Sequence, residues 1–183
     1  CSLRREEACF KLSGRGILLK GGGSMEEVLV SGLSRGELKT HVANGKIIRI
    51  GRGIYTWREP TPMEVARILH KRWPGIMLAG SSAVQLYSRK EMTFPLKFAY
   101  RHVVSGSQWF EVERTRQKTR FTFEGIPVQN PLLAAAAVED DQAVTMLETR
   151  YQNRRGKQAL EKELGCIARV PARVRELVNK SAV

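Results

Sequence analysis

A short run of basic and small residues between Ser34 and Asn44 has the composition of a surface that binds a nucleic-acid duplex. Leu38 and Val42 are four residues apart, so a helix from Arg35 to Asn44 turns them toward a core and leaves cations and small side chains opposite. Lys and Arg can donate to guanine O6 and N7 or to phosphate, and Thr and Ala can contact a thymine methyl group. The candidate contact residues on this helix are Arg35, Gly36, Lys39, Thr40 and Ala43. The helix start at Ser34 is a candidate phosphate site.

Two runs of β-branched and aromatic residues, Lys46–Ile50 and Gly53–Trp57, follow this helix. They flank Gly51-Arg52, which predicts a hairpin with a two-residue turn. In such a hairpin Arg49 and Arg52 would contact the DNA backbone or the minor groove, and Lys46 would meet a phosphate. The alternative is that the whole basic surface is a solvated face without a ligand.

Three capping boxes predict where helices begin, at Ser24 with Glu27, at Ser34 with Glu37 and at Thr61 with Glu64. Asn44-Gly45 predicts a left-handed end for the second of these helices. A further helix is expected before Gly21. A helix, two short helices joined by a tight turn and then a basic hairpin together predict a winged helix-turn-helix.

Composition limits the class of protein. The chain has 183 residues, a formal charge of +13, three cysteines and 42% apolar residues. Its longest uncharged stretches, 76–88 and 125–138, are shorter than the roughly 18 residues of a membrane span, so we expect a soluble protein, with no membrane among its partners. The odd, widely spaced cysteines predict a reducing, cytoplasmic environment, and Cys166 is expected to be buried. The positive charge predicts a polyanionic partner.

Two prolines at Pro60 and Pro62 mark the candidate domain boundary. We expect a winged helix-turn-helix in residues 1–59 and an α+β domain in residues 60–183. The second domain is predicted to contain a helix from Thr61, a strand at 76–79, a helix capped by Ser81, three or four antiparallel strands over 94–128, and C-terminal helices at 132–138, 141–151, 156–164 and 172–178. The predicted fold class is α+β with a small antiparallel sheet.

A second basic segment lies in this domain. Arg114, Arg116, Lys118 and Arg120 alternate with neutral residues, so a strand would place all four on one face. This ribbon could contact phosphates or simply protect a solvated sheet edge from aggregation. Arg150 and the neighbouring cations at 154–157 are expected at the C-terminal end of a helix, where the helix dipole stabilises positive charge.

The sequence offers little for catalysis. Asp140, Asp141 and Glu148 resemble the carboxylates of a metal-dependent nuclease, but the lysine that such chemistry needs is missing, and acids at 140–141 suit a helix N-terminus. The histidines are isolated and match neither a zinc site nor a catalytic triad. We therefore expect no catalytic residue, metal or cofactor.

Two segments of the predicted winged helix carry a family resemblance. Gly32–Leu38 and Gly45–Tyr55 resemble the "GxSRxxL…G.L.R..RGxY" run of the N-terminal domain of AbiEi-type antitoxins from bacterial type IV toxin–antitoxin systems. Leu78–Tyr87 and Gly125–Pro131 are similar to two later family segments, with Tyr87-Ser88 replacing the usual His-Gly and Leu132-Leu133 replacing Arg-Thr. The resemblance implies an antitoxin that represses its own operon at inverted repeats. It would oppose a nucleotidyltransferase-type toxin, and direct binding to that toxin is not required.

Two other functions stay open. One is a nucleic-acid-processing enzyme or an accessory factor of a mobile element, with the winged helix as a targeting module. The other is an RNA-binding module that stacks bases on Tyr55, Trp57 or Trp109.

Overall fold

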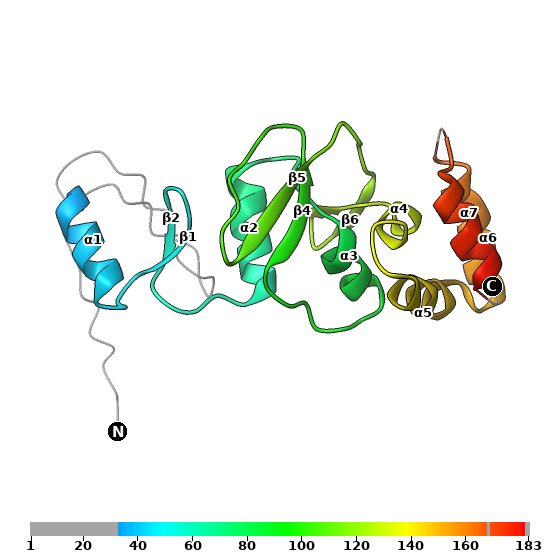
Figure 1. Cartoon of the computed structure of the whole chain (residues 1–183), viewed down its shortest axis with the longest axis horizontal. Coiled ribbons are helices and arrows are strands. Elements are labelled where there is room, and N and C mark those ends of the chain that lie inside the picture. Colours follow the sequence, from blue (N-terminus) through cyan, green and yellow to red (C-terminus); the bar gives the residue numbers. More distant parts are fainter. Residues whose placement is uncertain (1–32, 168, 182–183) are drawn as a thin grey trace, which may run out of the picture. The chain divides into compact units, whose positions relative to one another are not determined.

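The computed structural model describes residues 33–167 and 169–181 (Figure 1). The chain divides into two compact units. The first extends to Arg49 and also contains Gly53–Glu59. The second consists of Ile50–Arg52 and the chain from Pro60 onward. The predicted helix before Gly21 and the capping box at Ser24 lie outside the described residues. A winged helix-turn-helix is therefore not identified, and this finer assignment stays a prediction.

Helix α1 (Arg35–Ala43) begins at the predicted capping box. The Ser34 hydroxyl accepts the Glu37 N–H at 3.2 Å, and the Glu37 carboxylate accepts the Ser34 N–H at 2.7 Å. The helix ends at Asn44, and Gly45 follows with a φ of 68°, as predicted. The backbone N–H of Lys46 then donates to the His41 carbonyl at 3.0 Å, which ties the following chain to the end of α1.

The predicted hairpin is present, but its turn lies one residue later than expected. Strands β1 (Ile48–Gly51) and β2 (Ile54–Thr56) pair as an antiparallel two-stranded sheet. The turn residues are Arg52 and Gly53, not Gly51 and Arg52. Gly53 has a φ of 74°, a conformation that glycine adopts without strain, and this places it inside the turn.

The second unit contains a five-stranded sheet in the order β5-β4-β3-β7-β6. Its strands are β3 (Met77–Leu78), β4 (Leu96–Tyr100), β5 (Phe110–Arg114), β6 (Phe121–Phe123) and β7 (Ile126–Val128). Pairs β3–β4 and β6–β7 are antiparallel, whereas β3–β7 and β4–β5 are parallel. The prediction of a purely antiparallel sheet was therefore wrong.

The Ser105–Ser107 segment explains this error, because it resembles a hairpin turn and does not form one between neighbouring strands. The Ser107 N–H donates to the Phe110 carbonyl at 2.8 Å, so the segment folds onto the start of β5. A side chain at Gly106 would place its Cβ 2.8 Å from that same carbonyl oxygen, which explains why glycine is needed there. The chain thus returns along the sheet before β5 begins, and β5 runs parallel to β4.

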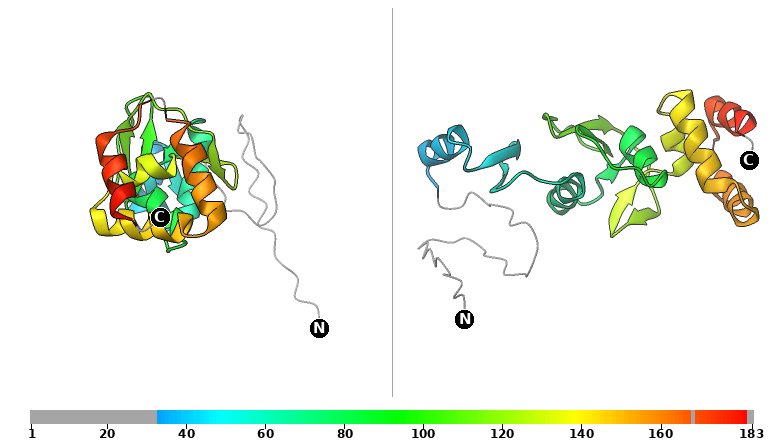
Figure 2. Two further views of the ribbon diagram at one scale, coloured as in Figure 1. Left: turned by 90° about the vertical axis from the view of Figure 1, so that its right-hand side faces the viewer. Right: turned by 90° about the horizontal axis from the view of Figure 1, so that it is seen from below.

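The helices of the second unit are α2 (Pro62–Arg72), α3 (Gly80–Tyr87), α4 (Pro131–Ala135), α5 (Asp140–Tyr151), α6 (Arg154–Leu164) and α7 (Ala172–Lys180). Thr61 and Glu64 form the predicted capping box of α2. The expected cap at Ser81 was wrong, because α3 begins one residue earlier, after Ala79, without a side-chain cap. Helices α5, α6 and α7 pack together at the C-terminal end (Figure 2). No helix in the described parts of the chain is both long and apolar enough to span a membrane.

Candidate nucleic-acid interface

The predicted contact residues of α1 all lie on its exposed side. Leu38, His41 and Val42 are half-buried, so the helix rests on a partly covered apolar edge and not on a fully buried core. The residues that are exposed include every predicted contact residue of this helix: Arg35, Gly36, Lys39, Thr40 and Ala43. The helix therefore presents two cations together with small side chains, and its surface is narrow enough to approach a groove.

An acid that the sequence argument did not place on this surface is also exposed. Glu37 is held at the helix start by the Ser34 N–H, and the hydrogen bonds from Ser34 lower its pKa below the usual range. Its charge therefore competes with a phosphate for the helix N-terminus. The hydroxyl of Ser34 is itself occupied by the Glu37 N–H, so Ser34 has a structural role there.

Thr40 is also partly engaged within the helix. Its hydroxyl donates to the Gly36 carbonyl at 3.0 Å. An approaching base would thus meet the methyl group and an oxygen acceptor, and not a free hydroxyl donor.

The hairpin supplies further exposed cations at Lys46, Arg49 and Arg52. The side chains of Ile47, Ile50 and Ile54 are buried, so one side of the hairpin is packed against the protein while its cations stay exposed. Lys46 is brought to the end of α1 by its backbone bond to His41, and Arg52 occupies the turn. Trp57 next to the hairpin has 52% of its surface exposed, whereas Trp109 is buried and packs edge-on against Phe94, so Trp109 is not free to stack on a base.

The basic ribbon expected over 114–120 is not a strand. β5 ends at Arg114, and residues 115–120 have no regular structure, although all four cations are exposed. After the backbone bond from the Thr115 N–H to the Tyr100 carbonyl, side-chain hydrogen bonds hold this segment. The Thr115 hydroxyl accepts a hydrogen bond from the Gln117 N–H, and the Thr119 hydroxyl donates to the Val128 carbonyl. The four cations therefore do not share one face of a strand, and the Arg120 guanidinium instead contacts the Cys166 sulfur.

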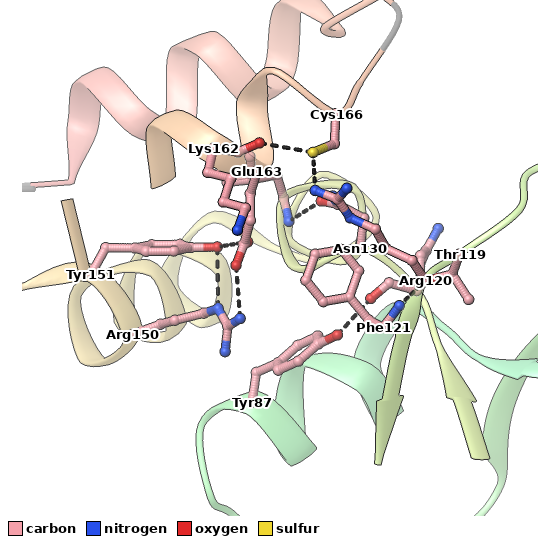
Figure 3. A network of polar contacts seen from close by, with 12 residues as sticks. Tyr87, Thr119, Arg120, Phe121, Asn130, Arg150, Tyr151, Lys162, Glu163 and Cys166 are labelled. Carbon is pink, nitrogen blue, oxygen red and sulfur yellow. Dashed lines mark hydrogen bonds and ion pairs between the residues drawn. The ribbon is translucent and has the colours of Figure 1, made fainter. Parts of the chain in front are cut away.

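Two residues of the second unit differ from expectation. Cys166 is exposed and not buried, and its thiol donates to the Lys162 carbonyl. Arg150, expected to serve a helix end, forms an ion pair at 2.8 Å with Glu163, which is 5% exposed and also accepts the Tyr151 hydroxyl (Figure 3). Burial raises the pKa of Tyr151, as it does that of Tyr87. Sequence spacing gave no signal for these contacts between separate elements.

Of the three carboxylates considered for nuclease chemistry, Asp140 is engaged in ion pairs with other side chains. Asp140 pairs with Arg173 and Lys180, each at 2.9 Å, and the hydrogen bond from Lys180 lowers the pKa of Asp140. Within residues 33–167 and 169–181, no group of three or more His, Cys, Asp or Glu side chains is placed to hold a metal ion. The Asp140 carboxylate therefore links α5 to α7.

Comparison with known proteins adds no assignment. No protein-family model matches the chain, and no curated protein matches it either. The molecule's function is therefore inferred from the geometry of α1 and of the hairpin.

Proposed function

We propose that this protein is a sequence-specific regulator that binds double-stranded DNA through α1 and the β1–β2 hairpin. The observation that carries the proposal is the exposed side of α1, where Arg35 and Lys39 lie among small residues. Lys46 adds a cation at the end of the same helix through the backbone bond to His41. A helix with such a surface fits the major groove, where its donors can reach guanine.

The cations have different tasks in this proposal. Lys39, in the middle of the exposed side, reads a base edge, and Arg35 reaches a base or a phosphate. Lys46, Arg49 and Arg52 contact the backbone or the minor groove and set the register of the complex. The loop cations at 114–120 are secondary candidates for phosphate contacts.

The biological role proposed here follows from the resemblance to AbiEi-type antitoxins. The protein would act in the cytoplasm, repress its own operon at inverted repeats and oppose a nucleotidyltransferase-type toxin, without a need for direct contact with that toxin. Mapping the protected DNA upstream of its own gene tests this role. A footprint over an inverted repeat is expected, and uniform protection of unrelated DNA would contradict it.

Two substitutions test the division of tasks. Lys39→Ala should cost about 1–3 kcal/mol on the specific site and little on random DNA, whereas Arg52→Ala should weaken both alike. Arg175→Ala, which removes an exposed cation from α7, is the matched control and should change neither. Binding of labelled duplexes at several salt concentrations measures these effects, and Arg52→Ala should also reduce the salt slope by about 0.9. Equal losses for Lys39→Ala on both kinds of DNA would refute base contact by α1.

Glu37→Gln tests whether the start of α1 faces phosphate. Glutamine also serves in capping boxes, so the helix start should survive. Loss of the negative charge should then strengthen binding to all duplexes by about two- to tenfold, the effect of one charge near a phosphate in a largely aqueous setting. Unchanged affinity in a normally folded variant would place the DNA elsewhere.

A further inference from the structure

The second unit contains a surface cavity of about 650 Å³, open to solvent on one side, that the sequence did not predict. It lies between the loop that precedes β6, the start of α4 and the residues 165–167, 169 and 171 that follow α6. Arg120 and Cys166 meet at its wall, with Phe121 and Asn130 nearby (Figure 3). Its volume is within the range of about 300–1,000 Å³ that is typical of small-molecule sites.

The charge around this cavity has one sign. Lys118, Arg120 and Arg169 line it, and no Asp or Glu is among its described lining residues. Neither Lys118 nor Arg169 forms an ion pair with any residue that the structure describes, and Arg120 contacts a sulfur atom instead of a carboxylate. Three cations at one cavity repel one another, and a bound anion would relieve that repulsion.

The remaining lining is suited to an organic group and not to a bare ion. Phe121, Leu133 and Ile167 contribute apolar surface. Asn130 is 8% exposed, and its Oδ1 already accepts the Leu132 N–H at 2.9 Å, so its NH₂ group is the end that can donate to a ligand. Apolar walls with a few polar groups and a concentrated charge are the usual features of a site for a phosphorylated metabolite.

We propose that this cavity binds a phosphorylated organic molecule of about the size of a mononucleotide. The cations at 118, 120 and 169 hold the phosphate, and the apolar wall at Phe121 packs against the organic part. This site is separate from α1 and the β1–β2 hairpin, because none of its lining residues lies on either. It shares only Lys118 and Arg120 with the secondary candidates for DNA contact.

Cys166 provides a built-in reporter for the test, because it is exposed at the cavity wall. In a Cys1→Ser/Cys9→Ser chain it is the sole remaining cysteine. Adenosine 5′-monophosphate should slow alkylation of Cys166 by iodoacetamide in a saturable way, with an apparent Kd below about 1 mM. Adenosine should give no such protection, and inorganic phosphate should protect more weakly. Calorimetric titration of the same chain gives a second measure of binding.

Arg169→Gln should weaken binding of the mononucleotide by about 10- to 100-fold, the loss expected for one charge-assisted hydrogen bond. Arg175→Gln removes the same charge from α7 outside the cavity lining and should leave binding unchanged. The proposal is overturned if the mononucleotide gives no saturable protection, or if both variants lose affinity equally. Protection by a DNA duplex but not by the mononucleotide would also overturn it, since the cations would then serve the DNA backbone.

Discussion

Replacing Glu163 by leucine should destabilise the second unit by about 3 kcal/mol. The Glu163 side chain is 7% exposed. It accepts one hydrogen bond from the Arg150 guanidinium, at 2.8 Å, and a second from the Tyr151 hydroxyl. Breaking a buried pair from one side costs about 3–5 kcal/mol, because the other charge stays behind without its partner. The Arg150 side chain is 29% exposed and can reach water, which places the expected cost at the lower end of that range.

The two tyrosines beside Arg150 limit how far its side chain can move. Its guanidinium lies 4.8 Å from the centre of the Tyr87 ring, and its Nε donates to the Tyr151 hydroxyl at 3.2 Å. These contacts keep the charge near the site that Glu163 would vacate. Arg150→Met combined with Glu163→Leu should therefore cost clearly less than the sum of the two single changes, with a coupling of about 1 kcal/mol or more.

Urea unfolding followed by near-ultraviolet circular dichroism measures both effects, because Trp73 and Trp109 lie in the second unit. Glu163→Gln is the conservative control: it retains an acceptor and volume, so it should cost less than the leucine change. A loss below about 1 kcal/mol for Glu163→Leu, or strictly additive losses, would refute the claim that this pair is energetically coupled.

Three further outcomes are expected. Gly156→Ala should cost about 1–3 kcal/mol in unfolding experiments, because its Cβ would lie 2.5 Å from the Tyr151 Cα. Burial raises the pKa of Tyr151 and Tyr87, so the unfolding free energy should fall above about pH 10, by up to about 1.4 kcal/mol per pH unit for each tyrosine, and Tyr151→Phe should reduce that slope. The pKa of Asp140 is lowered by Lys180, so its contribution to stability is present above pH 3.8 and lost as the pH falls further. In denaturant titrations, the Asp140→Asn variant should lose less unfolding free energy on acidification than the unchanged protein does.

Features that depend on residues close in sequence were predicted well. The capping boxes at Ser34 and Thr61 need only a hydroxyl and a carboxylate three residues apart, and both form with reciprocal hydrogen bonds. The left-handed backbone conformation of Gly45 was also predicted from neighbouring residues alone, because Asn-Gly commonly ends a helix in this way. The exposed side of α1 was also predicted, because the spacing of Leu38 and Val42 fixes which side is covered.

Features that depend on distant partners were missed. Alternation predicted a strand over residues 114–120, but residues 115–120 have no regular structure, and the Thr119 hydroxyl donates to the Val128 carbonyl of β7, the strand next to β6. Cys166 was expected to be buried because its sequence neighbours are small or apolar, whereas its contact with Arg120 spans 46 residues. Periodicity reports which side of one element is apolar and carries no information about which element covers it.

The distribution of ion pairs connects the two proposals. In the second unit, some of the acids form ion pairs with cations: Arg67–Glu124, Lys97–Glu111, Arg150–Glu163, Arg173–Asp140, Lys180–Asp140 and Lys180–Glu176. Among the described residues, no ion pair joins Lys39 on α1 or Arg169 at the cavity to an acid, which leaves both cations able to bind the anionic ligands that we propose.

The two expected ligands differ in how salt affects them. Duplex DNA releases condensed counterions, and its affinity falls with salt by about 0.9 log units per log unit for each phosphate neutralised. A mononucleotide carries no such condensed layer, so its affinity for the cavity should depend on salt much less steeply. Measuring both slopes on one preparation therefore separates an interface on α1 from a pocket in the second unit, even where their cations are chemically alike.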